Sequence, residues 1–172
     1  GGDNDIIKSE FFYDWYTEVG DADDGVNPSW YLGFAGGIAD PSDPGRVHYA
    51  ERFFLGGSSN LRGFEFRGVG PNEGDFALGG ETYLRGSIEY RYPLYSTALA
   101  GTSQRREVFR GTVFFDWGVL DPEAFHLSAE ETRASVGIGF GLAHPIPLSF
   151  NFGFPVRDGE GDEKEIFSFR LT

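Results

Sequence analysis

Few residues of this sequence have the types and spacing that catalysis requires. His144, Ser149 and Asn151 are the residue types of a phospholipase triad, in which a histidine takes the proton of a serine hydroxyl. Ser149 and Asn151 alternate along a predicted strand, whereas His144 lies in the proline turn "HPIP" before it. We do not expect the three side chains to converge, and we predict that the chain is not an enzyme.

The patterns that could bind ligands are also incomplete. Residues 158–163, "DGEGDE", resemble a calcium loop, but Glu163 occupies the sixth position, where such loops have glycine. "GIGFG" and "GVGPNEG" resemble phosphate loops without the helix that must follow them. Cysteine is absent, and 27 acidic residues against 14 basic ones argue against a nucleic-acid surface. We predict no cofactor, no metal and no nucleic-acid partner, and interpret 158–163 as a solvated acidic loop.

The segment "ERFFLGGSSNLRGFEFRGVGP", residues 51–71, is the most unusual part of the chain. It is too rich in glycine for a helix and too aromatic for a solvated linker, so it predicts a loop that packs against another part of the protein. If Arg62 within it is buried, its guanidinium needs carboxylate partners. From these residues alone, an exposed loop arginine is the simpler interpretation.

The elements that would position such a loop are strands. In "ETYLRGSIEYRY", residues 81–92, every charged side chain falls on an odd position and every large aliphatic side chain on an even one. Similar alternation recurs along the chain, separated by turn-forming segments. It predicts seven strands, at residues 6–18, 29–39, 80–93, 107–119, 132–143, 147–156 and 164–171.

Alternating strands suit either a soluble β-sandwich or a transmembrane barrel whose apolar face meets lipid. Three features favour an all-β, antiparallel, up-and-down transmembrane β-barrel. Most predicted strands have about 8–14 residues, close to the ~9–11 that cross a bilayer when tilted. Short turns alternate with longer, often acidic loops. Aromatic residues gather at the strand ends, at Tyr13, Trp15, Tyr90, Tyr92, Trp117 and Phe154.

Residues 136–154 are long and apolar enough to suggest a transmembrane helix. Pro145 and Pro147 lie at the centre of this stretch, and glycines recur at alternate positions. Both features oppose a helix, so the stretch predicts two strands joined by a proline turn.

Five segments, in order, carry a resemblance to a known family. They are "RFFLGGSSNLRGFEFRGVGP", "LGGETYLRGSIEYRYPL", "FRGTVFFDWGVL", "SVGIGFGLAHPIPLSFNFGFPV" and "IFSFRL". Together they closely resemble the C-terminal barrel of outer-membrane protein assembly factors of the BamA type, in the bacterial surface antigen superfamily. The resemblance covers nearly the whole chain. It implies that residues 1–172 are the last seven strands of a sixteen-stranded barrel, with an inward loop at about 40–79 and no POTRA domain in this chain.

The resemblance also implies a site. Leu61, Arg62, Gly63 and Phe64 match the motif of a long loop that, in this family, folds back into the barrel lumen. Glu89 and Asp116 match the lumen-facing acids that hold the arginine of that motif. The alternation pattern independently places the two acids on the polar faces of consecutive strands. With the resemblance, a buried Arg62 becomes the preferred interpretation.

The function that the resemblance implies is assembly and insertion of β-barrel proteins into the outer membrane of a Gram-negative bacterium. Client strands would be templated at a lateral seam between the first and last strands. The implied partners are outer-membrane lipids, unfolded outer-membrane clients, accessory assembly lipoproteins, and the N-terminal barrel strands and POTRA domains outside this chain. Two alternatives stay open: a secretion transporter of the two-partner or autotransporter-assembly type, and a passive porin-like channel.

Overall fold

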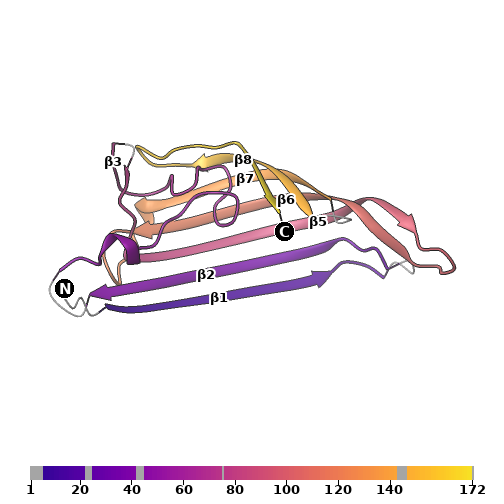
Figure 1. The fold of residues 1–172 in the computed structure, drawn as a ribbon, viewed down its shortest axis with the longest axis horizontal. Coiled ribbons are helices and arrows are strands. Elements are labelled where there is room, and N and C mark those ends of the chain that lie inside the picture. The colour runs from indigo at the N-terminus through magenta and orange to yellow at the C-terminus, as the bar shows by residue number, and fades with distance from the viewer. Residues whose placement is uncertain (1–5, 22–24, 42–44, 75, 143–146, 172) are drawn as a thin grey trace.

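The computed structural model describes residues 6–21, 25–41, 45–74, 76–142 and 147–171. Its main feature is one seven-stranded antiparallel sheet with the strand order β1-β2-β5-β6-β7-β8-β9 (Figure 1). Consecutive strands of the sheet are neighbours, as in an up-and-down wall, and β1 and β9 form its edges. The strands are β1 (Ile6–Glu18), β2 (Ser29–Pro41), β5 (Thr82–Ala98), β6 (Arg105–Asp121), β7 (Thr132–Leu142), β8 (Leu148–Arg157) and β9 (Phe167–Leu171).

One face of the sheet carries large apolar side chains that no other described part of the chain covers. An exposed apolar surface of this extent is far larger than soluble proteins present to water, and it matches a wall that faces lipid. A soluble sandwich would instead bury these rows against a second sheet. The exposed residues on this face include Ile7, Phe11, Tyr13, Trp15, Trp30, Phe34, Ile88, Val113, Phe115, Val136, Ile138, Phe140, Phe150, Phe154, Phe167 and Phe169.

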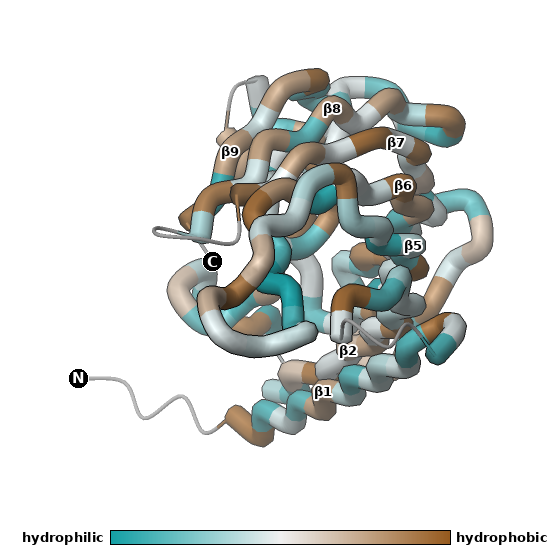
Figure 2. Tube along the Cα trace, turned by 90° about the vertical axis from the view of Figure 1, so that its right-hand side faces the viewer, coloured by the Kyte–Doolittle hydropathy of each residue, from teal (hydrophilic) through white to brown (hydrophobic). Residues whose placement is uncertain are grey.

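The opposite face is concave and curves around the connection between β2 and β5 (Figure 2). We call this connection, residues 42–81, the inward loop; its described part contains the short helix η1 (Tyr49–Glu51) and the small strands β3 (Asn72–Glu73) and β4 (Phe76–Ala77). The buried apolar cluster lies between the loop and the wall, so the loop supplies the core that the sheet lacks. Its members are Ala35, Ala39, Val47, Phe53, Leu55, Leu61, Phe64, Val69, Tyr83 and Leu120.

The predicted all-β antiparallel architecture is confirmed, with differences at the strand ends. The prediction for the third strand is wrong at residues 80–81, because β5 begins at Thr82; β5 then extends to Ala98, and β6 runs from Arg105 to Asp121, both beyond the predicted limits. The prediction for the last strand is wrong at residues 164–166, because β9 begins at Phe167. Most of the predicted proline turn at 144–147 lies outside the described residues. No helix in the described ranges is long and apolar enough to cross a membrane.

Candidate functional site

The inward loop turns sharply at residues 57–64 and buries its motif against the wall. Gly57 N–H donates to the carbonyl of Phe64 at 2.9 Å, and Leu61 N–H donates to the carbonyl of Gly57 at 3.2 Å. Leu61 and Phe64 are essentially inaccessible to solvent and belong to the apolar cluster. The buried side chains of Leu61 and Phe64 therefore hold the chain on both sides of Arg62 and direct Arg62 toward the sheet.

Gly63 lets the turn approach the wall closely. Its φ of +94° is in the left-handed region that side chains disfavour, and a Cβ there would lie 3.2 Å from the carbonyl of Gly153 on β8. A Cβ on Gly153 would in turn lie 2.6 Å from the Gly63 nitrogen. Glycine on both sides of this contact brings the loop backbone against β8.

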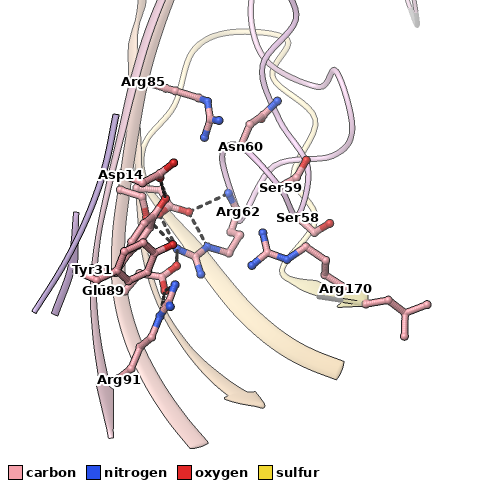
Figure 3. A pocket seen from close by; sticks show the side chains of 14 residues that line it. Asp14, Tyr31, Ser58, Ser59, Asn60, Arg62, Arg85, Glu89, Arg91 and Arg170 are labelled. Carbon is pink, nitrogen blue, oxygen red and sulfur yellow. Dashed lines mark hydrogen bonds and ion pairs between the residues drawn. The ribbon is translucent and has the colours of Figure 1, made fainter. Parts of the chain in front are cut away.

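Arg62 reaches two carboxylates on adjacent wall strands (Figure 3). Its Nε donates to Oδ2 of Asp116 at 2.7 Å and its Nη2 to Oδ1 at 2.7 Å, which is a bidentate pair. The same Nη2 lies 2.7 Å from Oε1 of Glu89. All three side chains are at most 7% exposed, so this ion-pair cluster is shielded from solvent.

The wall also holds the backbone of Arg62. Its N–H donates to Oδ2 of Asp116 at 3.2 Å, and its carbonyl accepts a hydrogen bond from the Ser135 hydroxyl on β7. The guanidinium carbon lies 3.5 Å from the centre of the Phe114 ring, a cation–π contact in a desolvated place. Side chain and backbone together attach the loop to β5, β6 and β7.

The charges of the cluster and its neighbour Arg91 balance. Both Nε and Nη2 of Arg91 lie 2.7 Å from Oε2 of Glu89, so two guanidinium groups face two carboxylates. Burial acts to lower the pKa of Arg62, but the hydrogen bonds and charges of Asp116 and Glu89 outweigh it and the pKa lies above its ordinary value. Arg62 therefore stays a cation, as a buried ion-pair anchor requires.

A comparison with known families identifies the group to which this sheet and loop belong. The Omp85 superfamily domain matches residues 1–172. The chain belongs to the Omp85 superfamily. Within this superfamily, the "Sorting and assembly machinery component 50 homolog" of Homo sapiens is 32% identical over 174 residues, covering 94% of this chain and 35% of the relative.

Bacterial members of the Omp85 superfamily match as well. The "Outer membrane protein assembly factor BamA" of Nitratidesulfovibrio vulgaris is 26% identical over 179 residues, covering the whole chain and 20% of that protein. A crystal structure of BamA from Haemophilus ducreyi lacking POTRA domains 1–3 shows the same fold, with a TM-score of 0.71, 22% identity and 98% of this chain covered. The chain spans about a third or less of the length of these proteins.

The structure of this Omp85 chain brings together Arg62, Glu89 and Asp116, the residues that the sequence singled out. Sequence reasoning missed Ser87, whose hydroxyl donates to Oδ1 of Asp116 at 2.6 Å, and Arg91, the second cation on Glu89. Both lie two residues from Glu89 on the same polar face, so the alternation pattern was the signal that could have found them.

The residues considered for other chemistry lie elsewhere. Ser149 and Asn151 share the β8 face that meets the loop, while His144 is outside the described residues. No group of three or more histidine or acidic residues in the described parts of the chain could hold a metal ion. The prediction of a solvated loop at 158–163 is wrong at Asp162, whose fully buried side chain pairs with Arg133.

Proposed function

We propose that this chain is the C-terminal part of an outer-membrane β-barrel that assembles and inserts other β-barrel proteins. The observation that carries the proposal is the match of the Omp85 superfamily domain over the full chain, with relatives in a bacterium and in humans that are both named for assembly. The exposed apolar face supports a lipid-facing wall. The concave face, filled by the inward loop, supports a lumen.

In this proposal the strands upstream of β1 close the barrel, and β9 forms one side of its seam. A strand edge presents unpaired N–H and C=O groups, which can template an incoming client strand by β-augmentation. The partners would be outer-membrane lipids, unfolded barrel clients and accessory lipoproteins, with the remaining barrel strands and POTRA domains supplied by the rest of the protein. A bacterial outer membrane is the location that we propose.

The role that we propose for the Arg62 cluster is to brace the wall by pinning the inward loop to β5 and β6. Removing one partner of a buried ion pair leaves an uncompensated charge and typically costs about 3–5 kcal/mol. An exposed pair would be worth under about 1 kcal/mol. The burial of Arg62, Glu89 and Asp116 therefore makes the pin strong enough to hold a long loop in one place.

Arg62→Ala in the full-length protein tests this role. We expect slower insertion of client barrels into vesicles, and faster proteolysis of the inward loop, because Asp116 and Glu89 lose their shared cation. Arg106→Ala is a matched control, since Arg106 is exposed at the far end of β6. Unchanged insertion and proteolysis in the Arg62→Ala protein would contradict the proposal.

The packing of the inward loop argues against a passive porin-like channel. A porin needs an open lumen, whereas this loop buries Leu55, Leu61 and Phe64 against the wall. Steady high conductance of the full-length protein in planar bilayers would favour the channel. The kind and number of domains upstream would distinguish an assembly factor from a secretion transporter.

A further inference from the structure

The chain from residue 163 to the end of the last strand, β9, bonds two different parts of the protein. β9 pairs with β8 only over Phe167–Leu171, and the final bond of this ladder runs from Gly153 N–H to the Ile166 carbonyl at 2.8 Å. The residues before Ile166 form hydrogen bonds with the inward loop. Glu163 N–H donates to the Gly68 carbonyl at 2.8 Å, and Glu165 N–H donates to the Gly63 carbonyl at 3.2 Å. In return, Glu65 N–H donates to the Glu163 carbonyl at 3.0 Å.

Pro155 explains why the β8–β9 ladder stops. The register pairs Phe152 with Phe167, so continuing it would place Pro155 opposite Lys164, two residues beyond the bonded Gly153–Ile166 pair. In an antiparallel ladder, bonded pairs recur at every second residue, and proline has no N–H to donate. The carbonyl of Lys164 therefore has no N–H opposite it at residue 155, and the ladder ends there. Glu163 and Glu165 alternate with Lys164, so their backbone groups point away from β8 and bond the inward loop.

Asp162 fastens this junction. Its side chain is fully buried, and its Oδ2 accepts hydrogen bonds from Arg133 Nε on β7 and from Gly159 N–H at 2.6 Å. Its Oδ1 accepts a hydrogen bond from Gly70 N–H, in the inward loop, at 3.3 Å. One carboxylate thus joins three segments: the wall at β7, the β8–β9 connection and the inward loop.

We propose that Asp162 is a positioning residue that couples the inward loop to the last strand, so that both move as one unit while the edge of β9 receives a client. The inference rests on the proposed assembly function. The Arg62 cluster holds the loop to β5 and β6, in the middle of the sheet. Asp162 and the backbone bonds of 163–165 connect the same loop to the segment that leads into the edge strand β9.

Asp162→Asn in the full-length protein is the first test. Among the described residues, the other carboxylate that pairs with Arg133 is the partly exposed Glu131, at 3.3 Å. We expect hydrogen exchange at the amides of Glu65, Glu163 and Glu165 to quicken about tenfold or more, while the Arg62 amide stays protected. Client insertion should slow in parallel. Asp158→Asn is the matched control, since it removes the same charge from the same connection at an exposed residue paired with Lys164.

An engineered disulfide tests whether Asp162 acts by coupling the inward loop to the last strand or only by pairing with Arg133. A Cβ built on Gly68 lies 3.1 Å from Glu163 Cβ and 2.8 Å from the Glu163 carbonyl oxygen, so the two backbones must separate by a few tenths of an ångström or more to reach the roughly 3.5–4.5 Å range of disulfides. In the Asp162→Asn protein, the Gly68→Cys/Glu163→Cys pair should restore client insertion when oxidised and lose it again on reduction. The bond replaces the loop–strand connection without replacing the carboxylate on Arg133.

Three results would overturn the inference. Asp162→Asn could behave like Asp158→Asn, the disulfide could fail to form in the folded protein, or it could form without restoring insertion. Failure of the proposed function looks different: the unmodified full-length protein would insert no client at all. The exchange measurement would still show whether Asp162 couples the loop to the last strand.

Discussion

The inward loop is held at two places that differ in kind. At Arg62 the attachment is made by side-chain charge, with two carboxylates and an aromatic ring around one buried cation. At residues 63–68 it is made mainly by backbone hydrogen bonds to 163–165, fastened by the single carboxylate of Asp162. Charge attachment depends on a few residue types, whereas backbone attachment depends on chain conformation and on glycine where the loop and the wall approach closely. The two places should therefore respond to different substitutions.

Asp116→Ala should have the largest effect on the charge attachment. It removes the acceptor for the Nε, Nη2 and backbone N–H of Arg62 and for the hydroxyl of Ser87. We expect a loss of about 3–5 kcal/mol in the free energy of unfolding, measured by denaturant titration of the full-length protein in detergent. Glu89→Ala should cost less, because Glu89 makes one contact with Arg62 and its other partner, Arg91, is partly exposed. An equal or greater loss for Glu89→Ala would contradict this ranking.

Gly63→Ala tests the point where the two attachments meet. The substitution adds strain at a φ of +94° and places a Cβ 3.2 Å from the backbone of Gly153, so we expect a loss of about 1–3 kcal/mol. Gly101→Ala is the control, since Gly101 has a φ of +78° and nothing within 4 Å of its added Cβ. The loss in the free energy of unfolding should be larger for Gly63→Ala than for Gly101→Ala, and the difference measures the cost of crowding the contact between loop and wall. Equal losses would mean that this close contact contributes nothing to stability.

Pro155→Val should have the smallest effect, and it tests whether the backbone attachment responds independently of the charge attachment. The new N–H at residue 155 could donate to the carbonyl of Lys164 and extend the β8–β9 ladder, while Glu163 and Glu165 keep their bonds to the inward loop on the other side of the chain. We expect slower hydrogen exchange at Glu163 and Glu165 by a few-fold, because an added hydrogen bond of about 0.5–1.5 kcal/mol stabilises the segment that carries both amides. Exchange at the Arg62 amide should not change. Unaltered exchange at all three amides would show that the missing N–H of Pro155 does not limit the β8–β9 ladder.

Much of the fold could be predicted from the chain because period-2 alternation is a local property. Each strand separates its polar and apolar residues within a few positions, which is enough to place Glu89 and Asp116 on one face. Glycine density and aromatic content likewise indicated that residues 51–71 pack against something. The extra ends of β5 and β6 at residues 96–98 and 105–106 were missed because they lie in a polar, turn-like stretch, whereas in the structure they pair with each other as strands.

What the sequence by itself determined is therefore which residues face together: the strands, their two faces and the acids on the polar one. Only the tertiary structure decided which distant groups meet. Arg62 reaches Asp116 across 54 positions, and an aspartate in an apparently solvated acidic loop is buried against Arg133 and the inward loop. Such contacts depend on register and loop closure across the whole sheet, and no pattern within one segment contains that information.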